Sequence, residues 1–136
     1  MEIIQRLADF RVTYRFFTHA EGGRRSYAIQ GYRPDWVYAE DYSEEAARSP
    51  SFMPVFMIIP VFVDENGLVY DRGEIIPLEG FANMHILNDQ LRPIHRRRIK
   101  VGTKGYFVEG SRRVAEATVI DILYLNHNEH EPKIEY

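Results

Sequence analysis

Short runs that alternate apolar and polar residues restrict the fold of this chain more than any other feature. In residues 10–17, FRVTYRFF, the apolar Val12, Tyr14 and Phe16 are separated by threonine or arginine. This period of two is typical of a β-strand with one buried face. The chain is therefore predicted to consist mainly of strands.

Further segments have β-branched or aromatic composition and are bounded by Gly, Pro or Asn. They cover residues 26–30, 36–38, 55–63, 68–70, 74–77, 82–87, 97–101, 104–109 and 113–123. Their number and spacing suit a barrel or a sandwich, and the pattern alone does not choose between them.

Turn residues predict how some of these strands connect. Gly22-Gly23 predicts a hairpin between residues 10–17 and 26–30, and Asn66-Gly67 predicts another after residues 55–63. Pro60 lacks an amide hydrogen, so residues 55–63 are expected at a sheet edge or a bulge. Ser43 is a suitable N-cap for one helical turn in residues 43–48.

The length of 136 residues predicts a single domain, residues 1–136, with a polar tail at 126–136. Without cysteine the chain has no disulfide, thiol nucleophile or Cys-based metal site. The longest apolar run, residues 52–63, is shorter than the roughly 20 residues of a membrane-spanning helix, and residues 1–10 do not have the pattern of a secretory signal. We therefore expect a cytoplasmic protein that does not enter a membrane.

Motifs that would indicate catalysis are missing from the sequence. There is no GxxxxGK[ST] loop and no GxSxG, and Ser111 lies in a predicted hairpin turn. His127 and His130 have metal-ligand spacing, but they lie in the polar tail beside Pro132, where fixed geometry is not expected. The sequence thus predicts no enzyme, cofactor or metal site.

Charge is distributed unevenly along the chain. Residues 35–79 contain ten acidic residues against two arginines, whereas residues 89–113 contain eight basic residues against two acidic ones. If the basic segment lies beside Arg24, Arg25 and Arg33, the two form a phosphate-binding face; otherwise the charges are a solvated surface. Aromatic residues next to arginines likewise fit either base stacking or the interior of a small barrel.

Several motifs in order resemble the third domain of translation elongation factor Tu. Residues 21–24, EGGR, precede residues 31–34, GYRP, and an aromatic strand; residues 105–119, GYFVEGSRRVAEATV, resemble the closing hairpin of that domain. Weaker similarity at residues 76–86 and 91–94 preserves the order. The resemblance covers residues 10–41 and 81–122, which is 74 of 136 residues. Arg25, Ser111 and Arg113 depart from the family pattern of His, Gly and Thr.

The resemblance implies a closed six-stranded antiparallel Greek-key β-barrel with an extra hairpin or loop insertion at about residues 42–80. In the elongation factor this domain contacts the T-stem side of aminoacyl-tRNA, the GTPase domain and the exchange factor. Matched by position, the RNA-contacting residues fall on Arg24, Arg25, Arg92, Glu109 and Gly110. Arg112 joins them because it lies in the same turn as Glu109 and Gly110. The turns at 21–24 and 109–112 are expected at one face of the molecule.

Two hypotheses for function follow. The first is a non-enzymatic binding module that contacts tRNA or other structured RNA through a basic face. The alternative is a protein-interaction module that binds a translation-related or toxin-related protein through the apolar residues 52–63 and the acidic residues 35–79. Association of two copies through the apolar segment is a further expectation.

Overall fold

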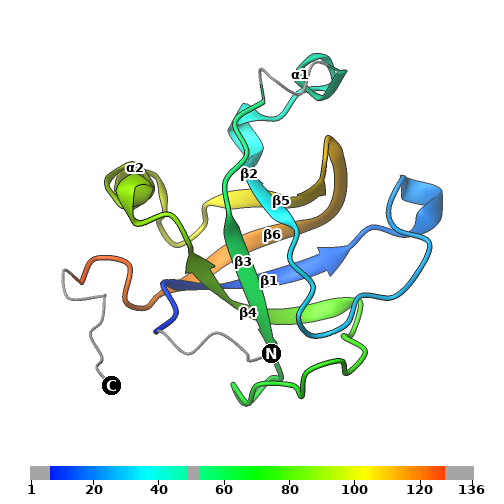
Figure 1. The fold of residues 1–136 in the computed structure, drawn as a ribbon, viewed down its shortest axis with the longest axis horizontal. Helices are drawn as coiled ribbons and strands as arrows, with labels where there is room; N and C mark the ends of the chain where they lie inside the picture. The colour runs from blue at the N-terminus through cyan, green and yellow to red at the C-terminus, as the bar shows by residue number, and fades with distance from the viewer. Residues whose placement is uncertain (1–6, 49–52, 128–136) are drawn as a thin grey trace.

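The computed structural model describes residues 7–48 and 53–127, and within them the regular structure is mostly β. The strands are β1 (Phe10–Phe16), β2 (Asp35–Tyr38), β3 (Ile58–Val63), β4 (Glu79–Ile86), β5 (Lys104–Glu109) and β6 (Arg112–Ile122) (Figure 1). The α-helices are α1 (Glu44–Arg48) and α2 (Arg92–Arg98), and 3-10 turns lie at His19–Glu21, Ala39–Asp41 and Asp89–Leu91. The expectation of an all-β fold is confirmed.

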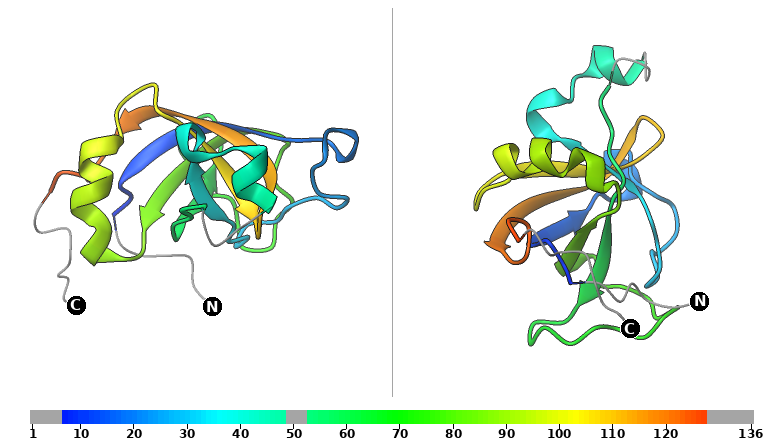
Figure 2. Two further views of the ribbon diagram at one scale, coloured as in Figure 1. Left: turned by 90° about the horizontal axis from the view of Figure 1, so that it is seen from above. Right: turned by 60° about the vertical axis from the view of Figure 1, so that its left-hand side comes forward.

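All six strands belong to one antiparallel sheet in the order β2-β5-β6-β1-β4-β3. The sheet is coiled, so its edge strands β2 and β3 approach each other across the molecule (Figures 1 and 2). One bridge pair joins these edges, with Trp36 N to Phe56 O at 2.9 Å and Phe56 N to Trp36 O at 2.8 Å. This bridge is isolated and is not part of a continuous ladder between β2 and β3, so the six strands form an open half-barrel.

The inner face of the sheet carries the hydrophobic core. Along β1, every second residue from Phe10 to Phe16 is buried and those between are half-buried, which confirms the predicted alternation. Aromatic rings fill the interior: the Tyr14 ring lies 5.1 Å from that of Phe62 and 6.4 Å from that of Phe107. Such large rings fill the space that a small barrel encloses.

The predicted hairpin between residues 10–17 and 26–30 is wrong. β1 pairs with β4 and β6, and residues 26–30 contribute only an isolated bridge between Ile29 and Ile75. After β1 the chain enters a 3-10 turn in which Thr18 and Glu21 form a reciprocal capping box. A Cβ at Gly23 would lie 2.2 Å from the Phe17 carbonyl oxygen, so the chain folds back on the strand end instead of returning beside β1.

The turn at Asn66-Gly67 is confirmed. Asp64 N donates to the Leu68 carbonyl at 2.8 Å, Gly67 has a φ of 85°, and the bridge between Val63 and Val69 extends the turn. β3 is an edge strand, as Pro60 predicted, and all its residues are buried. Part of the segment at 42–80 that we expected as an insertion therefore belongs to the sheet.

The prediction of a strand at residues 97–101 is wrong: residues 97–98 are the last two of α2, and residues 99–101 have no strand structure. Pro93 lies in the first turn of that helix, where a missing amide hydrogen costs no hydrogen bond. Three other predicted segments, 82–87, 104–109 and 113–123, correspond to β4, β5 and β6. The helical turn at 43–48 is also confirmed as α1, and the Ser43 hydroxyl accepts from Ala46 N at 3.0 Å.

Most of the polar tail expected at 126–136 lies outside the described residues, which end at residue 127. His130 and Pro132 are among the residues outside. In the described part of the chain, neither helix has the length and apolar composition that crossing a bilayer requires.

Candidate nucleic-acid interface

The loop after β1 and the turn between β5 and β6 meet at one end of the sheet, on the right in Figure 1. Arg24 Nη1 donates to Glu109 Oε2 at 2.8 Å, and Arg112 Nη2 donates to Glu109 Oε1 at 2.9 Å. Arg24 and Glu109 are 85 residues apart in sequence. The prediction that these two turns lie at one face is confirmed.

Tyr32 completes this group, which we call the Glu109 cluster: Arg24, Tyr32, Glu109 and Arg112. The Tyr32 hydroxyl donates to Glu109 Oε2 at 2.5 Å, and the Arg24 guanidinium lies 4.5 Å from the centre of the Tyr32 ring. Burial raises the pKa of Glu109, but the hydrogen bonds from Tyr32 and Arg112 and the charge of Arg24 outweigh it and lower the pKa below its ordinary value. Glu109 therefore stays ionised and holds two arginines in place.

The cluster leaves an excess of positive charge. Two guanidinium groups share one carboxylate, and Arg25 and Arg33, which directly follow two cluster residues, are exposed. Neither Arg25 nor Arg33 has an ion-pair partner within residues 7–48 and 53–127. Gly110 has a φ of 62° at the tip of the turn, a conformation that glycine adopts without strain. This end of the molecule can attract anions.

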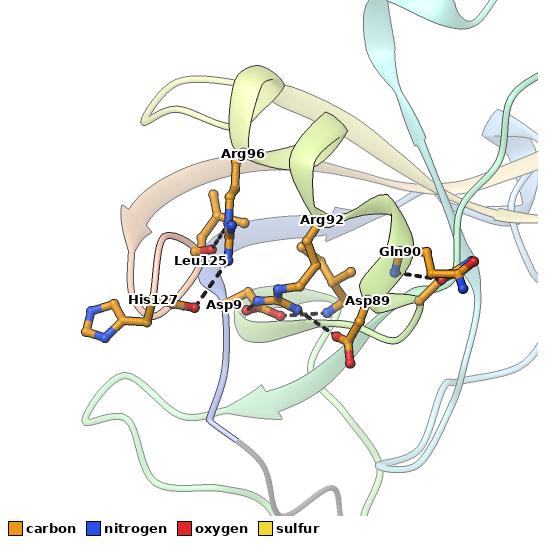
Figure 3. A network of polar contacts seen from close by, with 9 residues as sticks. Asp9, Asp89, Gln90, Arg92, Arg96, Leu125 and His127 are labelled. Atoms are coloured by element: carbon orange, nitrogen blue, oxygen red, sulfur yellow. Dashed lines mark hydrogen bonds and ion pairs between the residues drawn. The ribbon is translucent and has the colours of Figure 1, made fainter. Parts of the chain in front are cut away.

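Arg92 is not part of this end. It lies at the start of α2, on the left in Figure 1, and strand β5 runs from the side of the molecule where α2 lies to the turn that holds Glu109. Arg92 is 5% exposed and pairs with the buried Asp9 and with Asp89 (Figure 3). Its guanidinium serves the fold, and no local pattern indicates this pair because Asp9 is 83 residues away.

Two other arginines of α2 are also occupied. Arg96 donates to the carbonyls of Leu125 at 2.9 Å and His127 at 3.2 Å (Figure 3), and Arg98 binds Asp41 at 2.8 Å and Glu40 at 2.5 Å. Much of the basic segment thus holds the strands and the chain after β6 together. The basic segment therefore divides between two ends of the molecule and does not form one face.

A cavity of about 420 Å³ adjoins the Glu109 cluster. It shares Arg112 with the cluster, and Phe17, Tyr42 and Arg113 also line it. Sequence reasoning missed Phe17 and Tyr42 as site residues, because Phe17 lies in the predicted strand 10–17 and Tyr42 in the polar loop after residues 36–38. The basic character of Arg113 was the one available signal.

His95 is a buried titratable group of α2. His95 is buried, its Nδ1 lies 2.6 Å from the Tyr38 hydroxyl, and burial together with the charges of Arg98 and Arg92 lowers its pKa to about 4. In the described part of the chain, no group of three His, Asp or Glu side chains could hold a metal ion.

Comparison of the sequence with protein-family models and with curated proteins finds no match.

Proposed function

We propose that this chain is a non-enzymatic RNA-binding module related to the third domain of elongation factor Tu. In this proposal its half-barrel closes at the seam between β2 and β3 into a Greek-key barrel. Arg24, Arg25 and Arg112 contact the phosphates of a tRNA or another structured RNA, and Glu109 and Gly110 shape the turn that presents them.

The convergence of Arg24 and Arg112 on Glu109 carries this proposal. Two guanidiniums from distant parts of the chain would repel each other without the carboxylate between them, and Glu109 holds both near the surface. Each guanidinium has five N–H donors, so bonding to Glu109 leaves donors that can bind phosphate oxygens.

Structured RNA suits this arrangement better than a base-specific duplex target. A-form helices expose phosphates and 2′-hydroxyls, and their deep major groove excludes side chains. The exposed Arg25 next to the cluster adds an unpaired cation for the same backbone. We leave Arg92 out of the proposed interface because it is buried against Asp9.

The salt dependence of binding to a labelled tRNA tests the proposal. We expect affinity to fall steeply with salt, and Arg25→Gln and Arg112→Gln each to reduce the slope of log affinity against log salt by about one. Arg97→Gln and Lys100→Gln are matched controls, since both residues are exposed near α2, and they should leave the slope unchanged. The proposed interface is refuted if the unmodified protein does not bind at low salt. It is also refuted if the two control variants reduce the salt slope as much as Arg25→Gln and Arg112→Gln do.

A second candidate function is a protein-interaction module. Residues 64–79 are acidic and mostly exposed, and Leu68 and Ile75 are 65% and 60% exposed. Exposed apolar side chains among carboxylates fit a protein partner with an apolar centre and a basic rim. Translation-related and toxin-related proteins are the partners that the sequence suggests.

Affinity capture with point variants tests this second function. A protein retained by the unmodified chain and lost with Ile75→Asp would support it. Val101→Asp, at an equally exposed residue before β5, is the matched control and should retain the same protein. A capture profile that Ile75→Asp leaves unchanged would count against an interface at residues 64–79.

A further inference from the structure

The cavity beside the Glu109 cluster combines aromatic side chains with arginines and carboxylates. Its volume of about 420 Å³ lies within the roughly 300–1,000 Å³ of small-ligand sites. Half-buried Phe17 and Tyr42 supply aromatic surface, and Arg113 lines it with them. Arg112 belongs to both the cavity and the cluster, so a ligand bound at one lies next to the other.

The Arg113 guanidinium lies close to three aromatic rings. Its guanidinium carbon lies 4.4 Å from the ring centre of Tyr42, 4.9 Å from that of Tyr106 and 5.7 Å from that of Phe17. The side chain remains 33% exposed, and Glu44 approaches it at 3.8 Å. A planar cation fixed beside aromatic rings is a surface on which unpaired bases stack.

The charges around the cavity are balanced. Glu21 and Glu116 both line it, but Arg15 binds each of them at 3.0 Å. Glu44 is the third carboxylate, and it lies 3.8 Å from the Arg113 guanidinium. Each of these three carboxylates thus has an arginine next to it, and Arg112 is bound to Glu109, which favours a neutral ring in the cavity over a free anion or cation.

We infer that this cavity receives an unpaired base of the bound RNA while Arg112 contacts the phosphate next to that base. The inference rests on the proposed function and makes it more specific: the preferred RNA has an extrahelical nucleotide beside a duplex. Phosphates of the duplex lie along the Glu109 cluster, and the displaced base stacks on Phe17, Tyr42 and Arg113.

Two RNA hairpins that differ in one nucleotide test this inference. One is fully paired and the other carries a single bulged 2-aminopurine. We expect the full chain to bind the bulged hairpin roughly tenfold more tightly, because stacking on one aromatic platform contributes that much, and we expect the fluorescence of 2-aminopurine to fall on binding.

Phe17→Leu keeps apolar volume but removes the ring, and it should abolish the preference while affinity for the paired hairpin stays the same. Tyr42→Leu is the second variant, and both are checked by circular dichroism for retained fold. Tyr124→Leu is the matched control, because Tyr124 is 37% exposed beyond the far end of β6. Tyr124→Leu should retain the preference.

Three results would overturn the inference. Equal affinity for the two hairpins refutes the base site and leaves the phosphate-binding proposal intact. A preference that survives both Phe17→Leu and Tyr42→Leu places the base elsewhere. Failure to bind either hairpin at low salt refutes the proposed function, and the base site with it.

Discussion

At the scale of single residues, Glu109 connects two turns through three donors, Arg24, Tyr32 and Arg112. We predict that Glu109→Ala lowers the free energy of unfolding by about 1–3 kcal/mol, because the half-buried Tyr32 hydroxyl loses its partner. Glu65→Ala is the control, since Glu65 is exposed in a turn, and it should change stability by less than about 0.5 kcal/mol. Urea unfolding at neutral pH measures both, and equal values for the two variants would contradict the connecting role.

His95 gives a pH-dependent prediction. Burial, Arg98 and Arg92 lower its folded pKa to about 4 from 6.5, so the unfolded chain binds the proton first as pH falls. Stability from neutral His95 is thus complete above pH 6.5 and is lost between pH 6.5 and 4. From neutral pH to pH 5 we expect a loss of about 2 kcal/mol in the free energy of unfolding.

The comparison variant for His95 is His95→Gln, which cannot titrate but can still accept from the Tyr38 hydroxyl. Its loss of stability between neutral pH and pH 5 should be smaller than that of the unmodified chain. Parallel pH profiles for the two proteins, from urea unfolding, would show that His95 does not titrate in this range.

At the scale of elements, arginines of α2 bind segments next to the sheet, and His95 of α2 contacts Tyr38 of β2. Arg92 pairs with Asp9 just before β1, and Asp9 Oδ2 also accepts from Ile86 N at 2.8 Å at the end of β4 (Figure 3). Asp9 therefore links a helix and two strands, and none of these contacts follows from a local sequence pattern.

We predict that Asp9→Ala destabilises the chain by about 3–5 kcal/mol, because it leaves the Arg92 guanidinium buried with its main partner removed. Asp89→Ala removes the more exposed carboxylate of the same arginine, whose side chain is 56% exposed, and should cost less than about 1 kcal/mol. Thermal and urea unfolding measure the difference. If both variants lose a similar amount of unfolding free energy, burial of the Asp9–Arg92 pair does not determine how much that pair stabilises the fold.

The elements that sequence predicted correctly are those with local signals. The alternation in β1, the Asn66-Gly67 turn and the Ser43 cap each follow from neighbouring residues. The pairing of β1 with β4 and β6 does not, since it depends on contacts about 65 to 110 residues apart, and Gly22-Gly23 therefore suggested the wrong partner. Residues 97–98 belong to the helix α2 and not to the predicted strand 97–101. This helix docks through contacts with distant residues such as Asp9 and Leu125, which the local sequence does not indicate.

At the scale of the whole molecule, the seam between β2 and β3 decides whether the sheet closes. Phe56 pairs with Trp36 there, and its ring lies 4.7 Å from that of His95 and 5.8 Å from that of Tyr38. We predict that the Trp36 and Phe56 amides exchange with solvent as slowly as that of Val12 in β1. Exchange as fast as at the exposed Glu65 amide would show an open seam.

The candidate site could be predicted from the sequence only in part, because its residues come together through contacts that are distant in the sequence. The motifs EGGR and EGSR indicated two turns, and the structure brings Arg24, Glu109 and Arg112 together. The family resemblance placed Arg92 with them, because a sequence does not show which cations are already paired. The aromatic surface around Arg113 comes from three separate segments and carries no sequence motif.

The most direct test of RNA binding at the Glu109 cluster is an NMR titration of the arginine Nε–Hε signals with a tRNA. We predict that Arg24, Arg25 and Arg112 shift together at the lowest RNA concentrations, while the buried Arg92 and the distant Arg97 keep their positions. Shifts confined to Arg97 and its neighbours on α2, or no shift at any arginine at low salt, would contradict RNA binding at the Glu109 cluster.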